Sequence, residues 1–464
     1  MNAAGISLRT SMAAAAALIA VAAAAPKANA LEIKRMTLSN GAVLLVSEEH
    51  QLPMVTLSIA FDAGSRRDPA GKAGLASLTA HCLSQGTREL SAADFNQKVD
   101  FMGSAVSVDA GRDWANASLT SLTKYEAETL HLLAGIVTDP GLRDADIERK
   151  RTEQVAGIKA EEERPGYPAT VKFTRSLFGD APYGHPVEGY ADSVAKLTAE
   201  DVRSFYRDHY KLGSAVIAVT GDVHADEIKV LLEKQLSGIR GAVASQPVPP
   251  PPSVAPGLHL NVIDRNVTQA NVILGFGGIE RSNPDYYRLQ VMNYILGGGG
   301  FSSRLVKVVR SREGLAYSVG SGFSAGKFAG AFSVGLETKN ASANQAIKLV
   351  LDQIREIQEK PVSDEELDGA KKYLIGSFPL SIDRQSGIAS FMLGVELNGL
   401  GLDYADKFPK LIQAVTKEDV QKVARTYLHP DSVLIVAVAN QREAAIADAA
   451  IAQAGGGAAG APAH

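Results

Sequence analysis

The chain alternates short apolar runs with longer amphipathic stretches, and turn signals separate them. Two β-rich runs, residues 33–38 and 43–48, are joined by Asn40-Gly41, a dipeptide that favours a tight hairpin turn. Leu315–Phe323 and Phe328–Glu337 predict a second hairpin in the same way. Hairpins mixed with long helical stretches predict an α+β fold with mostly antiparallel sheets.

One pattern occurs in both halves of the chain. Thr198, with Asp201 three residues later, precedes a helical stretch and then an apolar run at 215–219. Thr416 and Asp419 stand 218 positions further along and precede the same two features. Both threonines are predicted N-caps of capping boxes. Three more residues recur after 215 positions, namely Phe61, Arg66 and Pro69 as Phe276, Arg281 and Pro284.

This repetition predicts a duplicated domain. We expect two homologous domains, each a mostly antiparallel sheet packed with helices, that face each other across a cavity. The Pro-rich stretch at 246–257 favours an extended linker. It separates an N-terminal domain at 31–245 from a C-terminal domain at 258–445, and an Ala/Gly-rich tail follows at 446–464.

Residues 1–30 have the form of a secretory signal peptide. Arg9 precedes an apolar run at 12–25, which is too short to span a membrane, and Ala28-Asn29-Ala30 offers a cleavage site. A retained membrane anchor is the alternative interpretation. We expect cleavage near Ala30 and an exported, periplasmic protein with no membrane span.

Composition narrows the functional classes further. The 464 residues carry a formal net charge of −4 without a basic block, which argues against nucleic-acid binding. The one cysteine, Cys82, excludes an internal disulfide and a Cys-rich zinc site.

Residues 74–87 predict a helix whose sequence carries a family resemblance. The frame Gly-Leu-Ala…His-Cys-Leu…Gly-Thr resembles the inverted zinc-binding helix of the pitrilysin/insulinase family of metallopeptidases. The resemblance implies two zinc ligands at positions 77 and 81 and a general base at position 80. Ser77 and Ala80 stand at the first ligand and the base, so only His81 matches the motif.

The family's third zinc ligand is a Glu on a later helix. In this sequence the corresponding helix is predicted over Asp146–Glu163. The matching position, 76 residues beyond His81, is Gly157. Glu153 and Glu161 each lie one helical turn away from it. A catalytic zinc site needs three protein ligands and a water. We therefore expect no cofactor on this chain and no proteolysis by the chain alone.

A second motif is complete. The segment from Arg310 to Tyr317 resembles the family's second-domain Arg/Tyr motif, with the same spacing of seven. The resemblance implies that this pair faces a zinc site from the other domain, binds the peptide backbone and stabilises the oxyanion. From the residues alone, Arg310 fits a solvated cation at a helix end and Tyr317 fits a core position.

Some members of the family work as heterodimers, in which one subunit carries the zinc motif and the other, with an eroded motif, supplies substrate-binding residues. This chain resembles the second kind. That resemblance predicts a zinc-bearing homologue as partner and peptides or unfolded proteins as substrates. An inert structural or peptide-holding protein is the alternative. An independently active metalloendopeptidase is a third alternative, which the residues at positions 77, 80 and 157 disfavour.

Overall fold

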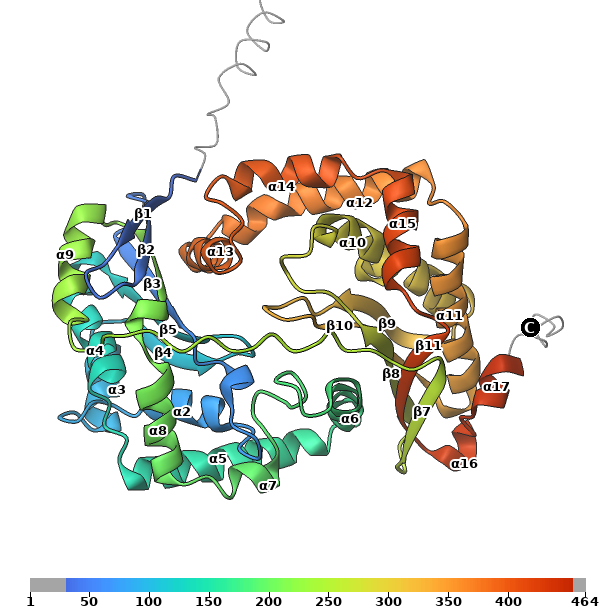
Figure 1. Ribbon diagram of the computed structural model, residues 1–464, viewed down its shortest axis with the longest axis horizontal. Helices are drawn as coiled ribbons and strands as arrows, with labels where there is room; N and C mark the ends of the chain where they lie inside the picture. Colours follow the sequence, from blue (N-terminus) through green and yellow to red (C-terminus); the bar gives the residue numbers. More distant parts are fainter. Residues whose placement is uncertain (1–30, 454–464) are drawn as a thin grey trace, which may run out of the picture.

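The computed structural model describes residues 31–453 (Figure 1). The predicted signal peptide, residues 1–30, and residues 454–464 of the predicted tail lie outside the described residues. None of the helices in the described part is long and apolar enough to cross a bilayer.

The N-terminal half forms one mixed sheet with helices around it. Its strands are β1 (Lys34–Thr37), β2 (Val43–Glu48), β3 (Met54–Phe61), β4 (Ala105–Ala110), β5 (Ala115–Leu122) and β6 (Val216–Gly221). Its helices are α2 (Leu75–Leu83), α3 (Ala92–Phe101), α4 (Glu126–Thr138), α5 (Asp144–Glu162), α6 (Gly166–Phe178), α7 (Ala191–Val194), α8 (Ala199–His209) and α9 (Ala225–Gln235).

The C-terminal half has the same plan. Its strands are β7 (Gly257–Asp264), β8 (Gln269–Gly277), β9 (Ala316–Phe323), β10 (Ala331–Lys339) and β11 (Ser432–Ala439). Its α-helices are α10 (Tyr286–Asn293), α11 (Ala343–Glu359), α12 (Asp364–Ser377), α13 (Gln385–Leu397), α14 (Tyr404–Gln413), α15 (Lys417–Tyr427), α16 (Gln441–Ala444) and α17 (Asp448–Gln453). Two π-helical segments lie at Tyr294–Gly298 and Val306–Arg312.

The two sheets share one strand order. The first runs β1-β2-β6-β3-β5-β4 and the second β7-β11-β8-β10-β9, so the first differs by the added edge strand β1. In each sheet one pair is parallel, β2 with β6 and β7 with β11, and the other pairs are antiparallel. The prediction of an α+β fold built from two similar, mostly antiparallel halves is confirmed.

The local signals that suggested the duplication are also in place. The hydroxyls of Thr198 and Thr416 accept the backbone N–H of Asp201 and Asp419, which completes a capping box at the start of α8 and of α15. β1 and β2 form the hairpin predicted at Asn40-Gly41.

The second predicted hairpin differs at its turn. β10 begins at Ala331 rather than Phe328, because the tip of the hairpin bonds to the N-terminal half instead of continuing the strand. The backbone N–H of Lys327 donates to Asp113 over 3.0 Å, and that of Phe328 donates to the Tyr183 hydroxyl over 3.1 Å. The β9–β10 hairpin therefore joins the two halves.

Each half also covers the sheet of the other half with one helix. Helix α6 packs Ala169, Phe173 and Leu177 against the C-terminal sheet, chiefly on β11 and β8. Helix α13 packs its apolar face against β6 and β3 of the N-terminal sheet. In Figure 1 the two helices lie beside the sheet of the opposite half. The sequence predicted halves that face each other, but it did not predict this exchange.

Polar contacts also hold α13 on the N-terminal sheet. Arg35 of β1 makes a two-pronged ion pair with Glu396, in which its Nη2 lies 2.8 Å from Oε1 and its Nε lies 3.1 Å from Oε2. Gln385 donates to the carbonyl of Met54 over 3.1 Å. The helix is thus held in register as well as buried.

Truncation of a buried residue on an exchanged helix tests this arrangement. Phe173 is 3% exposed, so we expect Phe173→Ala to lower the free energy of unfolding by about 3–5 kcal/mol through loss of burial and creation of a cavity. Phe101, which is 81% exposed, is the matched control, and Phe101→Ala should change stability by less than about 0.5 kcal/mol. Urea denaturation followed by circular dichroism measures both. Equal effects would contradict the exchange.

Candidate functional site

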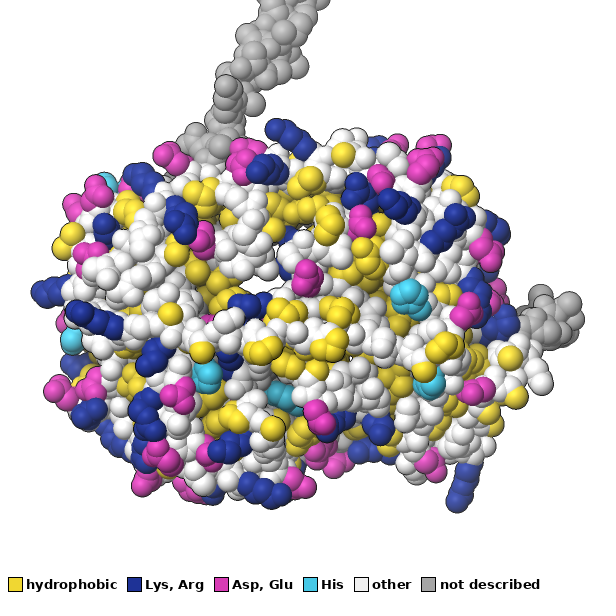
Figure 2. Space-filling model, in the orientation of Figure 1, with side chains coloured by type: hydrophobic (Ala, Val, Ile, Leu, Met, Phe, Trp, Pro, Cys, Tyr) yellow, Lys and Arg dark blue, Asp and Glu magenta, His cyan; other side chains and the backbone are white. Residues whose placement is uncertain are grey.

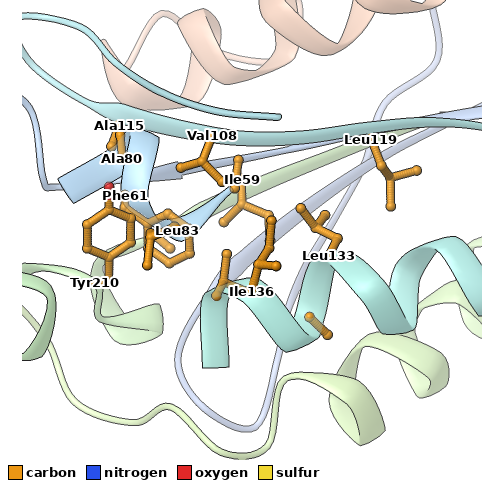
Figure 3. Packing of buried hydrophobic residues seen from close by; sticks show 14 of the residues in the cluster. Ile59, Phe61, Ala80, Leu83, Val108, Ala115, Leu119, Leu133, Ile136 and Tyr210 are labelled. Atoms are coloured by element: carbon orange, nitrogen blue, oxygen red, sulfur yellow. The ribbon is translucent and has the colours of Figure 1, made fainter. Parts of the chain in front are cut away.

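The degenerate zinc helix α2 is buried on nearly all sides. It packs against β4 and against helices α5 and α8. Two positions of the family motif are inaccessible, because Ser77 is 2% exposed and Ala80 is 0% exposed. Figure 3 shows Ala80 in the hydrophobic core near Phe61. His81 is the one residue of this helix that is not fully buried.

The first turn of α2 is held by one residue of the loop before it and by one from a distant helix. Asp68 accepts the backbone N–H of Gly74 and of Ala76, each over 2.7 Å. The side-chain amide of Gln154 donates to the carbonyls of Gly74 and Glu188 over 3.1 and 2.8 Å. Gly74 has φ +95°, and a Cβ there would lie 2.4 Å from the Glu188 oxygen. Sequence reasoning missed Asp68 and Gln154, because neither occupies a usual capping position.

The charge state of Asp68 follows from this placement. Burial raises its pKa to about 7, and the hydrogen bonds from the N–H groups of Ala76 and Gly74 oppose the rise. The neighbouring His185 is also largely buried, and burial lowers its pKa. Asp68 thus supports the first turn of α2, and both side chains line the cavity described below.

Position 157 offers no ligand either. The buried residues of α5 are Ile147, Gln154 and Ile158, whereas Gly157 is exposed with open space around it. Glu153, one turn earlier, pairs with Lys150 over 2.8 Å and with Arg149 over 3.1 Å on the outer surface.

The donor set does not fit the family's zinc ion. Ser77 offers a buried hydroxyl and Ala80 only a methyl group. His81 offers an imidazole, and Gly157 has no side chain. A single imidazole does not hold a catalytic zinc. Within the described residues, the one group of His, Cys, Asp or Glu side chains close enough to share a metal lies elsewhere and includes none of these positions.

The Arg/Tyr motif lies on irregular backbone in the C-terminal half. Arg310 is on a π-helical segment rather than the predicted α-helix, where the N–H of Glu313 reaches back five residues to the carbonyl of Val308. Tyr317 lies at a β-bulge of the edge strand β9, where Ser318 and Ala316 pair with consecutive residues of β10. Both irregularities are enriched at functional sites.

The bulge changes where the Tyr317 side chain points. A regular strand would alternate, but Tyr317 and Ser318 are both exposed between the buried Ala316 and Val319. Tyr317 is 57% exposed, so it is not a core residue.

Arg310 is exposed too, and its guanidinium lies 5.0 Å from the ring centre of Phe301. Among the described residues, neither the Arg310 nor the Tyr317 side chain has a hydrogen-bond or ion-pair partner. Both are available to a ligand.

Two cavities lie near the junction of the halves. One of about 740 Å³ is lined by both halves and by the linker, including Arg66, Asp68, His185, Gln246 and Arg265. A second, of about 440 Å³, separates the start of α6 from β8, β9 and β10 and reaches Ser318. Neither is lined by His81 or by Tyr317. In the space-filling view the two halves meet around a hollow near the centre of the face (Figure 2).

Family comparisons cover most of the chain. Residues 43–189 match the insulinase (peptidase family M16) domain, and residues 196–374 match the peptidase M16 inactive domain. The chain belongs to the peptidase M16 family.

Individual M16 relatives carry opposite descriptions. A Helicobacter pylori protein described as the non-peptidase homolog YmxG is 27% identical over 86% of this chain and 92% of its own length. A Streptomyces coelicolor protein described as an uncharacterized zinc protease is 28% identical over 85% of this chain and 87% of its own. Family membership alone therefore does not distinguish a peptidase from a non-peptidase. The evidence on zinc binding comes from the side chains of α2.

A solved structure supports the same assignment. The peptidase M16 inactive domain from Pseudomonas fluorescens superposes with a TM-score of 0.82 at 29% identity, covering 88% of this chain and 98% of that one. The M16 fold thus extends over both halves of this chain.

The raised pKa of Asp68 predicts a pH dependence of stability. Between about pH 4 and pH 7 the folded protein holds a proton on Asp68 that the unfolded chain has lost. The stability contributed by Asp68 is present below about pH 4 and is lost as the pH rises to 7, by at most about 1.4 kcal/mol per pH unit. Urea unfolding across this range should show a shallower slope for Asp68→Asn. The exposed Asp192→Asn should keep the wild-type slope, and a common slope for all three proteins would contradict the assignment.

Repair of one ligand should not create a protease. We expect Ser77→His to leave the purified chain unable to cleave casein or a fluorogenic peptide, with or without added zinc, because the base and the third ligand are still missing. Ala80→Glu should lower the thermal unfolding temperature, because it places a carboxyl group at a fully buried position. Chelator-sensitive cleavage by Ser77→His would refute this view of α2.

Proposed function

We propose that this M16 protein is a non-catalytic subunit of a zinc endopeptidase of the bacterial periplasm. It pairs with a zinc-bearing M16 homologue and supplies Arg310 and Tyr317 to the substrate site. Peptides or unfolded proteins are the substrates. The chain holds no zinc on α2 and cleaves no peptide alone.

The observation that carries this proposal is the backbone irregularity at Tyr317. A bulge leaves one residue of a strand unpaired, and bulges are enriched next to active sites, where they redirect a side chain. Here the bulge turns an aromatic hydroxyl outward on an edge strand, seven residues after an exposed arginine. The family resemblance assigns both side chains to peptide binding.

The chemistry of the two side chains suits that role. The planar guanidinium of Arg310 carries several N–H groups and can donate hydrogen bonds to a backbone carbonyl oxygen of the substrate. The hydroxyl of Tyr317 can donate to a carbonyl oxygen as negative charge develops there. Neither task needs a metal on this chain, which agrees with the donor set on α2.

The competing candidate is a structural or peptide-holding protein without a proteolytic partner. The non-peptidase description of the H. pylori relative is compatible with both candidates. In the peptide-holding case the exposed pair would bind substrate without any effect on a rate.

Substitution of the pair in an isolated complex separates the candidates. We expect Arg310→Ala and Tyr317→Phe to leave assembly intact and to lower kcat by about 10²–10³, the usual effect of one lost oxyanion donor. Co-expression with a zinc-motif homologue, size exclusion and kcat measurement provide the test.

Two matched controls exclude general effects. Tyr373 is 57% exposed like Tyr317, and Arg312 lies on the same π-helical segment as Arg310. Tyr373→Phe and Arg312→Ala should leave kcat unchanged. An unchanged kcat in Arg310→Ala and Tyr317→Phe, or failure to find any partner homologue, would favour the peptide-holding candidate.

A further inference from the structure

Three histidine and carboxylate side chains meet at one end of the N-terminal sheet, away from the Arg/Tyr motif. Glu48 ends β2 and pairs with Gly221, the last residue of the parallel strand β6. Because the two strands are parallel, the loops that follow them leave the sheet side by side. His50 lies in the first loop and His224 in the second.

The side chains converge. The ligand atoms of Glu48, His50 and His224 all lie within 4.8 Å of one another, and the two imidazole rings are 5.2 Å apart between centroids. Both histidines are exposed and Glu48 is partly buried, so small rotations can bring the ligand atoms to the spacing of a shared ion. Two imidazoles and a carboxylate are a common donor set for transition metals.

A fourth residue orients one of the imidazoles. The Asp222 carboxylate lies 2.8 Å from Nδ1 of His50, and its other oxygen accepts the Thr123 hydroxyl over 3.1 Å. This contact leaves Nε2 of His50 for a ligand. A carboxylate on the far nitrogen of a histidine is the usual second-sphere partner at zinc sites.

The surrounding backbone is fixed. The N–H of Glu49 donates to the carbonyl of Gly221 over 2.8 Å, and that of Asp222 donates to the carbonyl of Met54 over 2.9 Å. The two loops therefore present their side chains from a rigid support, which lowers the cost of binding.

The duplicated half provides an internal comparison. Asp264 is the last residue of β7, as Glu48 is of β2. Glu48 accepts the N–H of the first residue of α9, and Asp264 accepts that of the first residue of α16. This capping role is common to both halves. Asn440, rather than histidine, occupies the N-cap position that His224 occupies in the first half. The histidine pair is thus an addition that capping does not explain.

We propose that Glu48, His50 and His224 form a binding site for a divalent transition metal of the Zn²⁺ class, with Asp222 as the orienting residue. Three protein ligands leave a coordination position for water. Lys34, 2.8 Å from Oε1 of Glu48, pairs with that oxygen and competes with the ion for the carboxylate. The proposal revises the sequence-based expectation that this chain binds no metal, which rested on α2.

Zinc titration of the untagged mature chain tests the site. Competition against a chromophoric zinc chelator should give about one bound Zn²⁺ per chain. His50→Ala and His224→Ala should each weaken binding more than tenfold, and Asp222→Asn should weaken it by about 10–100-fold. Circular dichroism and thermal unfolding of the metal-free variants establish that they are folded.

Two further histidine variants serve as controls. His131 is exposed on α4, and His81 is the remaining histidine of α2. His131→Ala and His81→Ala should bind zinc as the wild type does. The proposal is overturned by the absence of saturable binding, by full binding in the His50→Ala/His224→Ala double variant, or by loss of binding in His81→Ala alone. None of these readouts depends on a partner subunit.

Discussion

The exchange of α6 and α13 between the two sheets is the constraint on which the rest of this structure depends. Each sheet buries one face under helices of its own half and the other face under a helix supplied by the opposite half. A sheet with an uncovered apolar face exposes more hydrophobic surface than a stable domain tolerates. The two halves are therefore separate in sequence but interdependent in packing.

This interdependence connects the two parts of the candidate site, namely the degenerate zinc helix and the Arg/Tyr motif. Helix α5 packs on α2 and leads through Pro165 into α6, which is seated on the C-terminal sheet. Tyr317 belongs to the edge strand of that same sheet. The degenerate zinc helix and the strand that carries Tyr317 are consequently connected through α5 and α6, although neither His81 nor Tyr317 lines either cavity at the junction.

A buried charge cluster reinforces the junction. The Arg66 side chain is fully buried, and it bonds to Asp62 and to Gln246 of the linker. Its guanidinium lies 5.6 Å from the ring centres of Trp114 and of Phe328, the latter at the tip of the β9–β10 hairpin. A buried guanidinium is tolerated only with such partners. The linker and the hairpin tip are thereby tied to the N-terminal half.

The sequence by itself determined the features that depend on neighbours along the chain. The hairpin at Asn40-Gly41, the capping boxes at Thr198 and Thr416, and the succession of strands and helices along each half follow from turn chemistry, capping and periodicity, which act over a few residues. The eroded motif at Ser77 and Ala80 could also be read directly, because a missing ligand needs no structure to be recognised.

Only the tertiary structure decided what depends on contacts between distant segments. The apolar faces of α6 and α13 have the same pattern whether they cover their own sheet or a foreign one, so their exchange could not be predicted. The bulge at Tyr317 depends on pairing with β10, and Gln154 reaches the carbonyl of Gly74 only after folding. His50 and His224, 174 residues apart, meet because β2 and β6 are parallel neighbours. Strand pairing is set by the packing of the whole domain, and local sequence does not encode it.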